Sequence, residues 1–134
     1  MSSQNSLPCA TEEQEQAAVF QWAALMENQL PELELLHHIP NGGLRSKTEA
    51  VRFKRTGVKA GIPDICLPVA RGAWHGLYIE LKRKDGGKLS SAQALMMSKL
   101  INQNYFAVCC HGAEDACAVI YEYLTGKNLE VDEL

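Results

Sequence analysis

Apolar and polar positions follow two different periods along the chain, and each period predicts a type of element. The helical period predicts four helices, at residues 12–30, 47–55, a segment that starts after Ser90, and 113–124. Thr11 is a suitable N-cap for the first helix, and Pro31 is expected to end it.

A period of two predicts a pair of strands, at 62–69 and 77–82. The apolar residues of each strand share one face. The other face carries Asp64 in the first strand and Glu80 and Lys82 in the second. Each strand therefore combines an apolar face with a face suited to chemistry.

The element order, completed by an extended segment at 35–39 and a buried strand at 105–110, predicts an α/β fold with a mixed central sheet flanked by helices. With 134 residues the chain is long enough for one domain, 1–134. We expect flexible ends at 1–11 and 126–134.

Composition limits the expected cellular location and the expected role of the cysteines. No segment approaches the roughly 20 apolar residues of a membrane span, and the N-terminus lacks the pattern of a signal peptide. We therefore expect a soluble protein that stays in the cytoplasm. Five cysteines without a CxxC pair predict reduced core residues rather than a disulfide framework or a zinc site.

Charge is distributed unevenly. The net charge is -3, but residues 45–88 hold 11 of the 13 basic residues with four acidic ones, a net charge of +7. The remainder carries -10. Such asymmetry is typical of a partner that is a polyanion, although a basic run can also be a solvated face.

The two predicted strands bring carboxylates together. If they form a hairpin that turns near Gly72, Asp64 lies opposite Glu80 or one residue from it. Facing carboxylates repel each other, and a divalent cation such as Mg²⁺ would neutralise them. Lys82 points to the same face and could stabilise charge that develops on a phosphate. The predicted chemistry is phosphodiester hydrolysis.

A simpler interpretation also fits these residues. Glu80 and Lys82 could form a surface ion pair on a solvated strand face, while Asp64 shapes a turn after Pro63. The coincidence of Pro63-Asp64, Glu80-x-Lys82 and the basic segment favours the metal site.

Four segments in order carry a family resemblance. They are His38-Ile39-Pro40-Asn41-Gly42-Gly43-x-Arg45, Gly57-Val58-Lys59-Ala60-Gly61-Ile62-Pro63-Asp64, Tyr78-Ile79-Glu80-Leu81-Lys82 and Leu89-Ser90-x-x-Gln93. Together they resemble the VRR-NUC family of PD-(D/E)xK nucleases, from about Glu12 to Leu124.

The resemblance implies a structure-selective DNA endonuclease that depends on Mg²⁺ or Mn²⁺. It implies catalytic roles for Asp64, Glu80 and Lys82, with the two carboxylates and the Leu81 backbone carbonyl as metal ligands. Members of this size, from bacteria and their viruses, resemble Holliday junction resolvases that act as homodimers. Larger relatives cut 5′ flaps. We therefore expect branched DNA as the substrate, and the cytoplasm of a bacterium or of a viral host as the location.

Members of this family also place an acidic residue of the first helix at the metal. Glu12, supported by Gln16 one turn later, is the first choice, and Glu15 is the second. The alternative is that these glutamates only interact favourably with the helix dipole.

The remaining polar residues predict contacts with DNA. Backbone amides and side chains could bind phosphate, and a turn or a solvated charge is the alternative at each position. Gln93 could approach the active-site strand, or could serve only as the capping partner of Ser90. The predicted DNA-binding residues are Asn41, Gly42, Gly43, Arg45, Lys54, Arg55, Lys59 and Gln93. Trp74 is expected to stack on a base or to lie in a dimer interface.

Two other functions compete with the nuclease. A non-catalytic DNA-binding module could keep the same fold, but it would not need two repelling carboxylates together. A protein-interaction domain is hard to reconcile with the basic segment 45–88.

Overall fold

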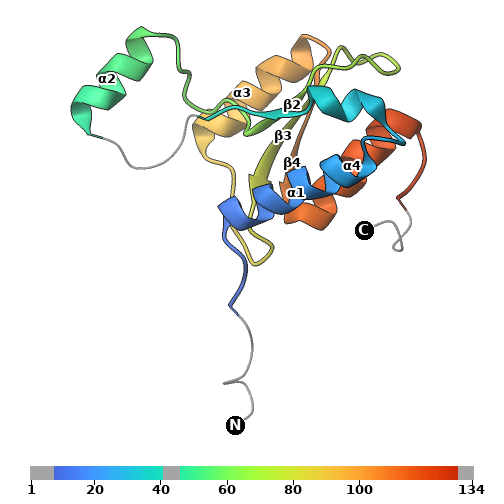
Figure 1. The fold of residues 1–134 in the computed structure, drawn as a ribbon. Helices are drawn as coiled ribbons and strands as arrows, with labels where there is room; N and C mark the ends of the chain where they lie inside the picture. Colours follow the sequence, from blue (N-terminus) through green and yellow to red (C-terminus); the bar gives the residue numbers. More distant parts are fainter. Residues whose placement is uncertain (1–7, 41–45, 130–134) are drawn as a thin grey trace.

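A mixed four-stranded sheet lies between two layers of helices in the computed structural model, which describes residues 8–40 and 46–129 (Figure 1). The elements are α1 (Glu12–Met26), the 3-10 helix η2 (Pro31–Leu35), β1 (His37–His38), α2 (Lys47–Arg55), β2 (Ile65–Leu67), β3 (Leu77–Lys82), α3 (Ser91–Asn102), β4 (Phe106–His111) and α4 (Ala113–Thr125). The strand order is β1-β2-β3-β4; β4 runs parallel to β3, and the other pairs are antiparallel. The predicted fold class is confirmed.

Helix α1 begins where the sequence predicts and ends earlier. The Thr11 hydroxyl accepts the Gln14 N–H (3.1 Å), and the Gln14 side chain accepts the Thr11 N–H (2.9 Å), which forms a capping box. The predicted end at Leu30 is wrong by four residues. Leu30 precedes a proline, and such a residue avoids helical backbone angles. The helix therefore does not reach Leu30, and Pro31 begins η2.

Strand β2 is shorter than predicted. It spans Ile65–Leu67 rather than 62–69, because Pro63 and Pro68 flank it and neither can donate a hydrogen bond. Strand β1 likewise covers only His37–His38 of the segment predicted to be extended.

The core lies on one face of the sheet, against α1 and α4. Val19 and Trp22 of α1 pack with Ile79 and Leu81 of β3 and with Ile120 of α4. In Figure 1 these two helices lie side by side in front of the sheet. Glu80 and Lys82 lie on the second face of β3, where Gln93 of α3 contacts both.

Helix α3 lies mainly against β4 and has fewer buried residues than α1 and α4. Met97 is its one fully buried residue within the described chain, whereas Leu95 and Ile101 are 57% and 42% exposed. The apolar side of this helix is therefore only partly buried. No helix in 8–40 or 46–129 is long and apolar enough to cross a membrane.

Candidate active site

The register of β2 and β3 brings Asp64 next to Glu80. Ile65 pairs with Ile79 and Leu67 with Leu77, so the next position places Asp64 opposite Glu80, as the sequence predicts. Asp64 Oδ2 accepts the Leu81 N–H at 2.9 Å. The N–H and C=O of one strand residue point to the same side, so the Leu81 carbonyl also lies on the Asp64 side.

Gln93 connects the Glu80 and Lys82 side chains. Its Nε2 donates to Glu80 Oε2 at 3.1 Å, and its Oε1 accepts from Lys82 Nζ at 3.1 Å. Lys82 Nζ also lies 3.5 Å from Glu80 Oε2. Gln93 Oε1 accepts the Ser90 N–H as well (2.9 Å), so the same side chain caps α3 and contacts β3.

Burial sets the electrostatics of this group. Glu80 is 3% exposed and Lys82 is 9% exposed, so this face of β3 is enclosed, and the alternative of an ion pair on a solvated strand face is wrong. Desolvation, with a further contribution from the Asp64 carboxylate, raises the pKa of Glu80 from 4.5 to about 8, although Lys82 opposes the shift. Glu80 Oε1 is buried and has no hydrogen-bond partner among the described residues.

These features fit a hard divalent cation. The cation would satisfy the orphaned Glu80 oxygen and offset the repulsion between the two carboxylates, and Mg²⁺ needs only one or two protein carboxylates beside water and phosphate. The parts of the chain described here hold no cluster of three or more His, Cys, Asp or Glu side chains close enough to bind a metal. A cation held by Asp64 and Glu80 would take its remaining oxygen ligands from water or substrate.

The first-helix glutamates do not join Asp64 and Glu80 in such a cluster. Glu12 is exposed in the first turn of α1. Glu15 is 6% exposed, and its Oε1 accepts the Ala113 N–H (3.1 Å) at the start of α4. Glu15 Oε2 is buried without a partner among the described residues. Glu15 thus caps α4, and metal binding by either glutamate stays a prediction.

The predicted DNA contacts are spread over several segments. Asn41, Gly42, Gly43 and Arg45 lie outside the described residues. Lys54 and Arg55 are exposed on α2, and Lys59 is exposed in the segment that follows it. Gln93 is half-buried against Glu80 and Lys82, and Gln16 is half-buried on α1.

Two residues near the carboxylates were not predicted. His38 Nδ1 donates to the Asp64 carbonyl at 2.8 Å, and the Ile39 N–H donates to the same oxygen at 2.7 Å, so β1 fixes the backbone that carries Asp64. Cys109 is level with Glu80 in the β3–β4 register, and burial raises the pKa of its thiol. The parallel pairing of distant strands places Cys109 there, and no local signal in the sequence indicates it.

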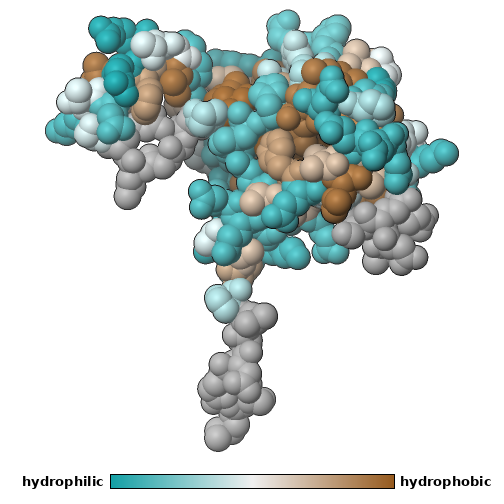
Figure 2. Space-filling model, viewed as in Figure 1, coloured by the Kyte–Doolittle hydropathy of each residue, from teal (hydrophilic) through white to brown (hydrophobic). Residues whose placement is uncertain are grey.

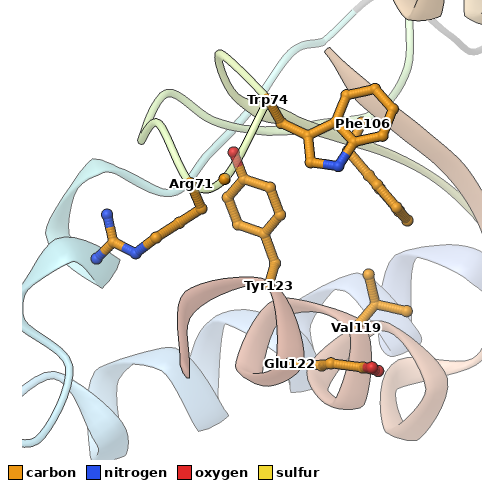
Figure 3. Close-up of a pocket in the computed structure, with 7 residues that line it drawn as sticks. Arg71, Trp74, Phe106, Val119, Glu122 and Tyr123 are labelled. Carbon is orange, nitrogen blue, oxygen red and sulfur yellow. The ribbon is translucent and has the colours of Figure 1, made fainter. Parts of the chain in front are cut away.

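Trp74 lines a separate cavity of about 330 Å³. Its lining is Arg71, Gly72, Trp74, Phe106, Val119, Glu122 and Tyr123, and includes none of the residues around Glu80. Figure 3 shows Tyr123 rising from α4 toward the loop that carries Arg71 and Trp74. The Trp74 ring packs edge-on against Phe106 at 5.3 Å between centroids, so this half-buried indole has a packing role.

Comparison with known proteins bears on the whole arrangement. A scan of protein families matches residues 2–114 to the VRR-NUC domain. A solved structure described as a "VRR_NUC domain protein" is 32% identical, with a TM-score of 0.76 over 92% of this chain and 95% of that chain. A search of curated proteins finds no match.

Proposed function

Because the chain belongs to the VRR-NUC family of nucleases, we propose that it is an endonuclease that hydrolyses phosphodiester bonds in branched DNA with Mg²⁺ or Mn²⁺. The observation that supports this proposal most strongly is the half-buried Asp64 opposite the buried Glu80, with Lys82 and Gln93 beside Glu80. A structural ion pair would not need a second carboxylate opposite the first.

Asp64, Glu80 and the Leu81 carbonyl are the groups that would hold the cation. When bound, the cation supplies charge stabilisation at the scissile phosphate. Glu80 must give up its proton for the cation to bind, because its pKa of about 8 keeps it largely protonated at neutral pH without one.

In this proposal, Lys82 acts on the phosphate. Its ammonium can donate to a non-bridging phosphate oxygen and stabilise the charge that develops when the water oxygen attacks phosphorus and a bridging P–O bond breaks. The attacking water loses a proton to solvent, and the displaced oxygen takes one up from solvent. Gln93 holds this ammonium next to Glu80, which limits the positions the flexible side chain can adopt. Gln93 is therefore a positioning residue.

The substrate we favour is the four-way junction, cut by a homodimer. A two-fold dimer presents two active sites, which matches the two strands that must be cut to resolve a junction. A 5′ flap or another branched DNA is the main competing substrate, and a non-catalytic DNA-binding module is the competing function.

Cleavage assays test both parts of the proposal. Purified protein would receive labelled four-way, flap and linear duplex DNA with Mg²⁺, Mn²⁺ or EDTA. We expect cutting of the four-way junction with either metal and none with EDTA. Asp64→Ala, Glu80→Ala and Lys82→Ala should abolish cutting but keep junction binding. Full activity in all three variants, or activity unaffected by EDTA, would overturn the catalytic assignment.

A further inference from the structure

Helix α2 separates its charges onto two sides. At 100° per residue, Lys47, Thr48, Val51, Arg52 and Arg55 share one side, and these five residues line one shallow hollow. We call this set the α2 basic face. The single acidic residue of the helix, Glu49, lies on the opposite side with Ala50 and Phe53, and the Arg52 guanidinium carbon lies 5.5 Å from the centre of the Phe53 ring.

The α2 basic face is not explained by packing. None of the nine described residues of α2 is buried, and Val51 is 66% exposed. Figures 1 and 2 show the helix standing out from the body of the protein. The Ser46 hydroxyl accepts the Glu49 N–H (3.1 Å), and the Thr56 hydroxyl donates to the Arg52 carbonyl (2.8 Å), so local bonds hold both ends.

An anionic partner would stabilise this helix. Nine residues form only a marginal helix in isolation, and neighbouring like charges destabilise it further. The helix has four basic residues and one acidic residue, so its charge is complementary to a dense row of negative charge such as a phosphate backbone. The exposed Val51 lies among them, where it could contact sugar carbons.

The chain after α2 leads directly to the candidate active site. Gly61 approaches α3 so closely that a Cβ there would lie 2.4 Å from the Ala92 carbonyl oxygen. Asp64 follows three residues later. The segment between α2 and Asp64 therefore packs beside Gln93, and α2 extends away from this contact.

We propose that the α2 basic face binds the phosphate backbone of a duplex arm outside the cleavage point. This inference rests on the proposed function in that DNA is the substrate, and it adds a binding surface separate from the carboxylates. Lys47, Arg52 and Arg55 each contact phosphate. A second copy of the chain is the competing occupant, because residues outside 45–88 carry a net charge of -10.

The test compares Lys47→Gln/Arg52→Gln/Arg55→Gln with the wild type and with Lys99→Gln/Lys127→Gln, which removes exposed charges elsewhere. Anisotropy of a labelled four-way junction is measured in EDTA over a series of salt concentrations. At about 0.1 M salt we expect the triple variant to bind at least about ten-fold more weakly, and its salt dependence to fall by about 3 in log–log slope. Its thermal unfolding should be unchanged, and junction binding to the wild type should slow amide exchange in residues 47–55.

The outcomes separate this inference from the proposed function. A triple variant that binds DNA like the wild type overturns the inference while leaving the catalytic proposal intact. A wild-type protein that neither binds nor cuts branched DNA overturns both. If the triple variant changes from dimer to monomer by light scattering, the surface binds a second copy and the DNA assignment is wrong.

Discussion

Glu80 combines full burial with a titratable carboxyl group. It is 3% exposed, and one of its oxygens has no partner within the described residues. Gln93 and Lys82 satisfy the other oxygen. A carboxylate in this environment is costly without a cation, which is why its pKa rises to about 8.

Stability of the metal-free protein should fall as pH rises from about 4.5 to about 8. Over this range the unfolded chain loses the Glu80 proton while the folded chain keeps it, so deprotonation favours unfolding. The difference corresponds to at most about 5 kcal/mol. Urea unfolding in EDTA at several pH values measures it. Glu80→Gln, which stays neutral, should lose most of this dependence, and the exposed Glu13→Gln should retain it. An equal slope in Glu80→Gln would contradict the assignment.

Among the elements, the N-terminus of α3 has two roles. Ser90 and Gln93 form its capping box, and Gln93 also holds Lys82 and Glu80. Gly61, in the loop before β2, packs closely against the same segment. The start of α3 therefore contacts both β3 and the segment that leads to Asp64.

Substitutions in the capping box should separate stability from activity. Ser90→Ala removes the hydroxyl that accepts the Gln93 N–H and should cost about 1 kcal/mol of unfolding free energy with little loss of cleavage rate. Gln93→Ala removes the link to Lys82 and should lower the rate on the order of ten- to a hundred-fold. Denaturant unfolding and single-turnover cleavage measure the two effects. Equal rates for the two variants would show that Gln93 serves only as a cap.

Two glycines in the loop before β2 form a matched pair. Both have positive φ, +104° at Gly57 and +83° at Gly61, but only Gly61 approaches a neighbouring backbone. Gly57→Ala should cost about 1 kcal/mol from strain alone. Gly61→Ala should cost more than about 3 kcal/mol, because Ala92 must move as well. Thermal unfolding compares them, and similar losses would contradict the close approach to α3.

At the scale of the whole molecule, charge and topology divide the chain into two regions. Acidic residues dominate outside 45–88, and the basic residues gather in α2 and around β3. The proposed dimer would place two such basic regions on one substrate.

A cruciform plasmid tests whether two sites act together. Wild-type protein should linearise the plasmid, because paired cuts across a junction break both strands of the duplex. A heterodimer with one Glu80→Ala subunit should only nick it. Gel electrophoresis of the plasmid forms distinguishes these products. Linearisation by such a heterodimer would contradict paired cutting.

Much of the molecule was predictable because local patterns determine it. Capping residues fixed the starts of α1 and α3, and the hairpin arithmetic placed Asp64 opposite Glu80. Errors occurred at element ends, where Pro31 and Pro63 override the periodicity.

By itself the sequence determined which residues share a strand face, because the side-chain period of two needs no distant partner. It also determined the charge distribution and the family resemblance. The tertiary structure alone decided that this face is enclosed, that Gln93 joins Glu80 to Lys82, and that Glu15 caps α4. These contacts join residues 11, 13 and 98 positions apart, and packing between layers brings such residues together.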